Sequence, residues 1–270
     1  MQLKPITCGI AVIGLVACGN NDSTQTLTLT GSSTVAPVAS EIAKRYEDAN
    51  PEIRVNVQTG GSSQGIADAR SGVADIGMAS RSLTEEESDL IAHTIARDGI
   101  TIIVNQENSI DSLSTEEIID IYTGEIKNWQ EVGGENRPIT VVNKADGRAT
   151  LAVFLDFLDL DNQQIEPDQI IGDNEQGIQT VAGNPTAIGY VSIGTAEFHR
   201  DDGTPISLVA INGIEPSSEA VSQGEFPISR PLNLVTKGEP TALSQDFITF
   251  AQSSQVHDTI QEQFFVPVQN

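Results

Sequence analysis

The chain has 270 residues, of which 38 are Asp or Glu and 14 are Lys or Arg, so its formal net charge is −24. With 38% hydrophobic residues it has enough apolar side chains for a globular core, which argues against wholesale disorder. The acidic excess argues against nucleic-acid binding and against charge-driven adhesion to an anionic membrane, because both need a surplus of cations. The length predicts one large domain or two ordinary ones.

The N-terminus predicts a processed leader and a tether. Residues 8–17 form an apolar run that is too short to span a bilayer as a mature helix. The run ends in LVAC, which resembles a bacterial lipobox, where the cysteine is lipidated and becomes the first mature residue. We therefore expect a signal peptide over residues 1–17, lipidation at Cys18 and a tether over 18–26. A plain secretory signal cut nearby is the alternative. The expected location is extracytoplasmic, in a periplasm or at the cell surface, with the lipid anchor as the only membrane contact.

The first third of the chain alternates strands and helices. Residues 26–30 and 53–57 alternate polar and apolar side chains, which predicts two strands. Between them, apolar residues recur at helical spacing over 35–49. A short helix that includes Ile66 and a buried strand over 72–78 follow. This rhythm implies an α/β fold with a parallel sheet.

The rest of the chain continues with strands and helices. The run Ser114-Thr115-Glu116-Glu117 is a capping box, which predicts the start of a helix. The other expected elements are strands at residues 100–104, 138–143, 188–191, 206–211 and 231–236, a helix over 151–158 and a C-terminal helix marked by Phe247, Phe250 and Ala251.

Three loops carry hydroxyl or cationic side chains, and each lies between a predicted strand and a helix N-terminus: Gly31–Thr34, Gly60–Ser63 and Lys144–Thr150. A helix N-terminus presents unpaired N–H groups and the positive end of the helix dipole, and hydroxyls add further donors. These features together favour an anion site. In any one loop the Ser or Thr can be an ordinary N-cap. Three such loops at the carboxyl ends of strands, where α/β proteins bind ligands, indicate one shared site.

Six runs of sequence within residues 27–268 resemble the phosphate-binding lipoproteins of bacterial phosphate ABC transporters. They are GSSTVAP, VQTGGSSQGIADARSGVADIGMASR, DGITIIVN, IYTGEIKNWQEVGG, AIGYVSIG and FPISRPLNLVTKG. The resemblance implies a two-lobed periplasmic-binding-protein fold of type II, with a ligand cleft between the lobes and a hinge that closes them. It implies lobe 1 over residues 27–104 and 227–270, lobe 2 over residues 105–226, and crossings near Val104–Asn105 and Phe226–Pro227.

The resemblance also implies phosphate contacts from these loops and from the end of the third strand. In the last loop many family members have an Arg followed by Gly-Ser-Gly-Thr, whereas here Lys144 replaces the Arg and Arg148 replaces the Ser. A planar guanidinium can grip two oxygens and an ammonium cannot, so Arg81 and Arg148 are the expected cationic ligands ahead of Lys144. The full expected set is Ser33, Thr34, Ser62, Ser63, Ser80, Arg81, Lys144, Arg148, Ala149 and Thr150.

The family resemblance implies capture of one inorganic phosphate ion, without any bond being made or broken, by a monomer that delivers it to the transmembrane subunits of an ABC permease. Telling phosphate from sulfate requires an acceptor for the ligand's proton, because sulfate carries none at neutral pH. Asp75, Asp146 or a serine hydroxyl are the candidates. Binding of another tetrahedral oxyanion, such as sulfate, arsenate or a tungstate-like ion, therefore stays open.

An enzyme is the competing hypothesis. Residues 61–65 fit the G-x-S-x-G pattern of a hydrolase nucleophile elbow, with Ser63 as nucleophile and His199 or His257 as partner. The pattern follows only the second strand, too early for that fold, and no HGGG-like oxyanion segment precedes it. The sequence lacks a Walker A lysine, a G-x-G-x-x-G motif and an H-E-x-x-H motif. We therefore expect no catalytic residue, no cofactor and no metal. A third hypothesis, an interaction protein that lost its ligand, is disfavoured by the intact hydroxyl and Arg positions.

Overall fold

The structure is a computed structural model that describes residues 24–268. The expected signal peptide (residues 1–17), the lipidation site Cys18 and most of the tether lie outside these residues. Strand β1 begins at Gln25, so the last two residues assigned to the tether belong to the fold. Among the described helices, none is long and apolar enough to cross a membrane.

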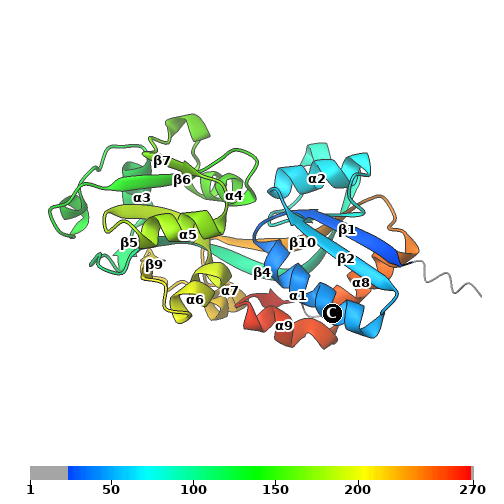
Figure 1. The fold of residues 1–270 in the computed structure, drawn as a ribbon. Coiled ribbons are helices and arrows are strands. Elements are labelled where there is room, and N and C mark those ends of the chain that lie inside the picture. Colours follow the sequence, from blue (N-terminus) through cyan, green and yellow to red (C-terminus); the bar gives the residue numbers. More distant parts are fainter. Residues whose placement is uncertain (1–23, 269–270) are drawn as a thin grey trace, which may run out of the picture.

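The first of two α/β lobes is formed by the N-terminal third of the chain (Figure 1). Its elements are β1 (Gln25–Gly31), α1 (Val35–Ala49), β2 (Ile53–Thr59), α2 (Ser62–Ser71), β3 (Ile76–Ala79) and the short 3-10 helix η1 (Glu85–Glu87). Strands β2, β1 and β3 are parallel neighbours, which confirms the parallel pairing that the sequence predicts. Helix α1 buries Val35, Val38 and Ile42 on one face, as their spacing predicts.

The second lobe is formed by the middle of the chain. Its elements are β5 (Ser112–Leu113), α3 (Thr115–Tyr122), η2 (Trp129–Val132), β6 (Thr140–Lys144), α4 (Ala149–Leu158), η3 (Asn162–Gln164), β7 (Gln169–Ile171), α5 (Asn174–Ala182), β8 (Ala187–Ser192), α6 (Ile193–Asp201), β9 (Ile206–Ile211) and α7 (Ser218–Gln223). The predicted capping box is confirmed, because the Ser114 hydroxyl accepts from Glu117 N and the Glu117 carboxylate accepts from Ser114 N.

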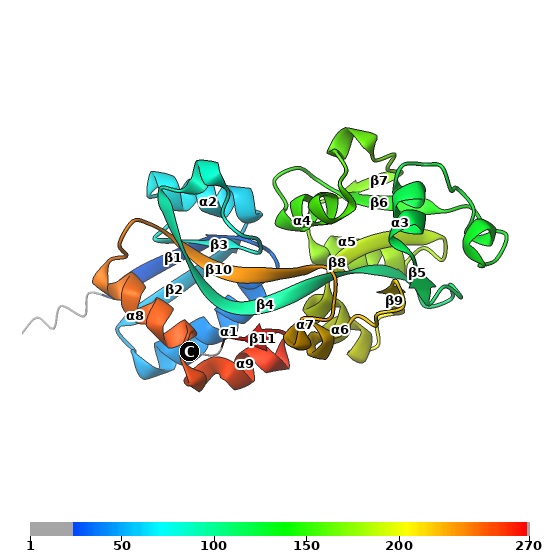
Figure 2. The same cartoon turned by 180° about the vertical axis from the view of Figure 1, so that it is seen from behind.

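Two antiparallel strands, β4 (Leu90–Asn105) and β10 (Ser229–Lys237), join the lobes and run side by side in Figure 2. Strand β4 pairs with β10 as far as Gly99 and with β8 from Ile100 onward. The crossing in β4 therefore lies about five residues before the expected Val104–Asn105. Strand β10 begins its pairing with the first lobe at Ser229, just after the expected Phe226–Pro227.

Each lobe has its own hydrophobic core. The first-lobe core contains Leu29, Ile42 and Met78, and the C-terminal segment adds Phe247 and Ile260 to it. The largest cluster of the second lobe contains Trp129, Tyr122, Phe154 and Tyr190 among its buried aromatic rings. The C-terminal elements are α8 (Ala242–Ala251), η4 (Ser254–Val256), α9 (His257–Glu262) and β11 (Val266–Pro267), which pairs with β4. Two separately packed cores joined by two strands allow a cavity to form between the lobes.

Candidate functional site

A small polar cavity lies between the lobes, at the carboxyl ends of β1, β3 and β6. The strand-to-helix loops of both lobes meet there, as the sequence predicts for ligand-binding loops. With the space at its mouth that is open to solvent included, the cavity measures about 220 Å³. Its lining residues are Ser32, Ser33, Thr34, Gly61, Ser62, Ser80, Lys144, Arg148, Ala149, Thr150, Gly172, Asp173 and Asn174.

Hydroxyl groups dominate the first-lobe wall of the cavity. The Ser32 hydroxyl accepts from the N–H groups of Thr34 and Val35, both at 3.2 Å, and donates to Ser80 Oγ at 3.0 Å. The Ser62 hydroxyl accepts from Ser80 N at 3.1 Å. These bonds fix the three loops of this wall against one another. Ser32, Thr34, Ser62 and Ser80 are all buried.

Two helices begin at the cavity without side-chain caps. Helix α2 follows Gly61 in the first lobe, and α4 follows Arg148 in the second; neither preceding residue makes a side-chain cap hydrogen bond. The first N–H groups of a helix have no intrahelical partner, and the helix dipole places positive charge at this end. The two helices therefore offer backbone donors to an anion.

Arg148 supplies a free guanidinium to the cavity. Its side chain has no hydrogen-bond or ion-pair partner among residues 24–268. It packs against Gly61, whose φ of +97° favours glycine and whose added Cβ would lie 3.2 Å from Arg148 Cδ. A larger residue at position 61 would therefore crowd the guanidinium, and glycine leaves it room to reach into the cavity.

Lys144 lies at the base of the cavity with 3% of its surface exposed. Its ammonium donates to Asp173 O at 3.3 Å and to Asn174 Oδ1 at 3.2 Å, and lies 6.0 Å from the centre of the Tyr190 ring. Burial lowers the pKa of Lys144 to about 7, helped by the positive charges of Arg230 and Arg148 and opposed by Asp173. Lys144 can therefore gain or lose a proton near neutral pH, which an arginine in its place could not do.

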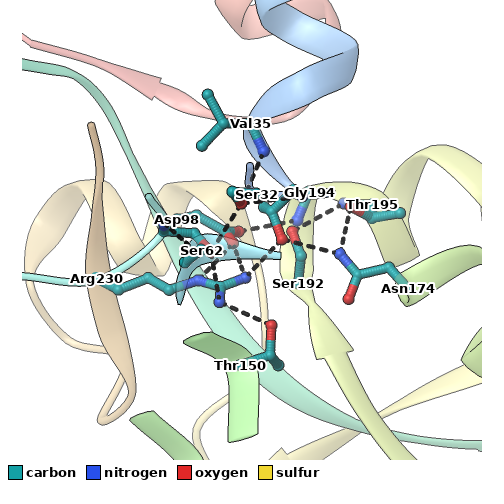
Figure 3. Close-up of polar contacts among 12 residues, drawn as sticks. Ser32, Val35, Ser62, Asp98, Thr150, Asn174, Ser192, Gly194, Thr195 and Arg230 are labelled. Carbon is teal, nitrogen blue, oxygen red and sulfur yellow. Dashed lines mark hydrogen bonds and ion pairs between the residues drawn. The ribbon is translucent and has the colours of Figure 1, made fainter. Parts of the chain in front are cut away.

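Behind the hydroxyl wall lies an ion pair between Arg230 and Asp98, with both side chains 1% exposed. In Figure 3 the guanidinium of Arg230 lies between the Asp98 carboxylate and the Thr150 hydroxyl. The sequence-based reasoning missed both residues. The run FPISRPL was noted only as part of a resemblance, and the predicted strand began one residue after Arg230.

The structure brings together eight of the ten expected site residues and separates two. Ser33, Thr34, Ser62, Ser80, Lys144, Arg148, Ala149 and Thr150 all line the cavity. Arg81 is directed elsewhere, because its guanidinium donates to both carboxylate oxygens of Glu87 at 2.7 Å. Arg81 is therefore not among the residues that line the cavity, contrary to its expected position. Ser63 is exposed next to the cavity, where its backbone N–H donates to Gly147 O at 3.2 Å across the lobes.

The carboxylates that the sequence suggested as proton acceptors lie outside the cavity. Asp75 accepts from Thr28 N at 2.8 Å, and Asp146 accepts from Asn162 Nδ2 at 2.9 Å. Asp173 lines the cavity instead and was not predicted. Its carboxylate caps α5 by accepting from Gln176 N at 2.9 Å, an N-cap position that sequence reasoning could have noticed.

The hydrolase arrangement does not form. Within the described part of the chain, no hydrogen bond joins the Ser63 hydroxyl to a histidine, and His199 bonds Glu175 at 2.8 Å. Over residues 24–268, no cluster of three or more His, Cys, Asp or Glu side chains is placed to hold a metal ion. What the cavity can do chemically is donate hydrogen bonds and positive charge to a small anion.

Two α/β lobes joined by two strands, with a donor-rich cavity between them, define the class of this protein. Residues 19–255 match the PBP superfamily domain, and the chain belongs to this superfamily, whose periplasmic-binding-protein fold it has. A relative named phosphate-binding protein PstS, from Bacillus subtilis, is 31% identical over 259 residues, which cover 93% of this chain and 84% of the relative. The protein of the same name from Borreliella burgdorferi is 29% identical, with 94% of each chain covered.

A solved structure shows the same similarity. A substrate-binding protein from Clostridium perfringens, assigned to phosphate ABC transport and solved with bound phosphate, superposes with a TM-score of 0.85 at 32% identity. The similarity covers 91% of this chain and 100% of that one. These relatives are named as binding proteins and not as enzymes.

Proposed function

We propose that this protein captures inorganic phosphate outside the cytoplasm and delivers it to the transmembrane subunits of an ABC import permease. The observation that carries the proposal is the guanidinium of Arg148, which has no partner among residues 24–268 and lies in a cavity whose other groups are mainly hydroxyls and uncapped helix N-termini. These groups present hydrogen-bond donors and positive charge from both lobes, as a small oxyanion requires. The names of the Bacillus subtilis and Clostridium perfringens relatives support phosphate as that ion.

The size of the cavity supports a ligand of few atoms. The enclosed part of the cavity measures about 10 Å³, whereas pockets for drug-sized molecules typically measure roughly 300–1,000 Å³. A nucleotide or a peptide does not fit such a space, which supports a small ion as the ligand. The proposed contacts are the hydroxyls of Ser33, Thr34, Ser62, Ser80 and Thr150, the N–H groups that begin at Ala149, and the cations Arg148 and Lys144.

Binding has to overcome the protein's own negative charge. At a net charge of −24 the mean field repels an anion. Most of the acidic side chains lie on the solvated surface, where salt screens them over about 8–10 Å. Donors inside the cavity act at contact distance and in a lower effective dielectric. Local groups therefore decide the affinity, and the surface charge affects mainly the rate of association.

Asp173 is the candidate acceptor for the proton of a protonated oxyanion. It is the one acidic residue among those described as lining the cavity. A carboxylate beside an anion is repulsive unless the anion carries a proton that the carboxylate can accept. Hydrogen phosphate and hydrogen arsenate carry such a proton at neutral pH, and sulfate does not. The second oxygen of the Asp173 carboxylate, if it accepts that proton, selects phosphate or arsenate over sulfate.

The rest of the proposal concerns the protein's place in the cell. We propose that residues 1–17 are removed and that Cys18 is then lipidated. We also propose that the protein is a monomer and that the ligand binds without any covalent reaction at Ser63. The names of the relatives support the binding role. A Cys18→Ser variant should lose its partition into detergent, and a variant that partitions like the wild type would contradict lipidation.

Titration calorimetry with phosphate, arsenate and sulfate tests the ligand. We expect tight one-to-one binding of phosphate, comparable binding of arsenate and weak binding of sulfate. Tight sulfate binding without phosphate binding would replace the proposed ligand. Absence of binding by all three ions would favour an interaction protein that has lost its ligand.

A further inference from the structure

Arg230 is a buried cation that the proposed ligand contacts do not use. It lies on β10 opposite Asp98 on β4, next to Ser229 and Gly99, where the pairing of these two strands ends. Burying an ion pair this deeply costs desolvation energy, so such a pair is by itself a weak source of stability. The other contacts of Arg230 indicate a different role.

All five N–H groups of the Arg230 guanidinium have protein acceptors. Nε and Nη2 donate to Asp98 Oδ2 at 3.1 and 2.8 Å. Nη2 also donates to Thr34 Oγ1 at 3.3 Å. Nη1 donates to Thr150 Oγ1 at 2.9 Å and to Ser80 Oγ at 3.4 Å. No N–H group remains for a bound ion, so Arg230 acts through these neighbours.

The hydroxyls that accept from Arg230 have their own protons left to donate. A hydroxyl has one proton and two lone pairs. Thr34 Oγ1 accepts from Arg230 and from Asn174 Nδ2 at 3.0 Å. Ser80 Oγ accepts from Arg230 and from Ser32 Oγ at 3.0 Å. Both lone pairs of these two oxygens are occupied, so each O–H can only donate.

We propose that Arg230, held by Asp98, is a positioning residue that makes the hydroxyls of Thr34 and Ser80 obligate donors to the bound ion and holds the Thr150 hydroxyl, which accepts from Nη1, in place beside the same ion. The proposal rests on the proposed function, because it requires an oxyanion in the cavity that all three hydroxyls line. Thr34 and Ser80 belong to the first lobe and Thr150 to the second. The Arg230 guanidinium, which lies on a strand that joins the lobes, therefore orients hydroxyls of both walls toward the same ion (Figure 3). In this way it couples closure of the lobes to binding of the ion.

A double-mutant cycle between Arg230→Lys and Thr150→Val distinguishes this role from a purely structural one. Arg230→Lys keeps a cation beside Asp98 but lacks the planar fork that reaches several hydroxyls. In the wild-type background, Thr150→Val should weaken phosphate binding about tenfold in titration calorimetry. In the Arg230→Lys background the same change should weaken phosphate binding about twofold or less, because the Thr150 hydroxyl is no longer held in place by Nη1 of Arg230. If the loss of affinity in the double variant equals the product of the losses in the two single variants, the two residues act independently and the proposal is overturned.

Arg81→Lys is the matched control, since Arg81 also forms a bidentate ion pair but lies outside the cavity lining. It should leave phosphate affinity within about twofold of wild type and show no coupling to Thr150→Val. If thermal unfolding shows that Arg230→Lys does not fold, Asp98→Asn takes its place in the cycle. This change weakens the ion pair that holds the Arg230 guanidinium, so we expect the same coupling to Thr150→Val. A wild-type protein that binds no phosphate would refute the proposed function before any variant is compared.

Discussion

The two walls of the cavity offer different chemical groups to an anion. The first-lobe wall supplies the hydroxyls of Ser33, Thr34, Ser62 and Ser80, and among the described lining residues it supplies no cation. The second-lobe wall supplies both lining cations, Lys144 and Arg148. Hydrogen bonds from hydroxyls depend on direction, whereas the attraction of a cation depends on its charge state. The contribution of the first wall to phosphate affinity should therefore depend on the geometry of its hydroxyls, and that of the second wall on charge and pH.

The largest effect should come from removing the free cation of the second wall. Arg148→Ala should weaken phosphate binding about 100-fold, because a guanidinium that donates two charge-assisted hydrogen bonds contributes about 3 kcal/mol. Titration calorimetry measures the change. Arg137→Ala is the matched control, because it removes the same charge from a side chain of the same lobe that is 44% exposed and outside the cavity. A loss no greater than that of the control would show that Arg148 points into solvent.

The second-largest effect should be a pH dependence that belongs to the second wall. Lys144 has a pKa of about 7 in the ligand-free protein, and a bound anion favours its charged form. Above pH 7 Lys144 must take up a proton when phosphate binds. The ratio of wild-type to Lys144→Met affinity for phosphate should therefore fall about tenfold between pH 7 and pH 8.5. The ratio of the two proteins removes the titration of phosphate itself. A ratio that does not change with pH would show that Lys144 keeps its proton throughout.

The same lowered pKa affects the stability of the ligand-free protein. The unfolded chain holds the Lys144 proton more tightly than the folded chain does, because the ordinary pKa is 10.5. The contribution of Lys144 to the free energy of unfolding should therefore rise as the pH rises from about 7 toward 10.5. Thermal unfolding of wild type and Lys144→Met over this range isolates that contribution.

A smaller effect is expected in the first wall. Ser62→Ala should weaken phosphate binding between about threefold and tenfold, since it removes one uncharged donor. Ser63→Ala is the neighbouring control, because Ser63 is exposed and its link to Gly147 uses the backbone N–H. Calorimetry of the control should give an affinity within about twofold of wild type. Equal losses of phosphate affinity in the two variants would show that the Ser62 hydroxyl contributes no more to binding than the exposed Ser63 hydroxyl.

The smallest effect on binding should come from Arg81, whose side chain is 13% exposed in its ion pair with Glu87. Arg81→Gln should leave phosphate affinity within about twofold but lower the free energy of unfolding by about 1 kcal/mol at neutral pH. Arg81 lowers the pKa of Glu87, so this difference in stability should shrink as the pH falls below the ordinary value of 4.5. A large loss of affinity would place a cation in the first wall after all.

The sequence predicts the loops of the site well because their signals are local. Strand and helix periodicities place Gly31–Thr34, Gly60–Ser63 and Lys144–Thr150 between elements, and parallel strands bring such loops to one edge. Arg81 shows the limit of this reasoning. Its position after β3 suggests a ligand, but Glu87 turns back toward it through η1, where a Thr84–Glu87 capping box gave an overlooked signal.

Long-range partners are what the sequence could not predict. Arg230 and Asp98 are separated by 132 residues and become neighbours only through the antiparallel pairing of β10 with β4. The first half of β4 was also missed, since the half-buried His93 and the exposed Arg97 interrupt the apolar alternation near Thr94. The predicted strand at residues 100–104 is the part of β4 that is buried throughout.

Strand β4 has a mechanical consequence, because it is hydrogen-bonded along almost its whole length to neighbours in one lobe or the other. A hinge made of free loops can swing over a wide range, whereas an uninterrupted strand can only bend or twist elastically without breaking its ladder. Any movement of the lobes must be absorbed near Gly99, where one set of neighbours gives way to the next. The joint between the lobes therefore resembles a stiff spring, which favours small, rapid opening motions and resists wide separation.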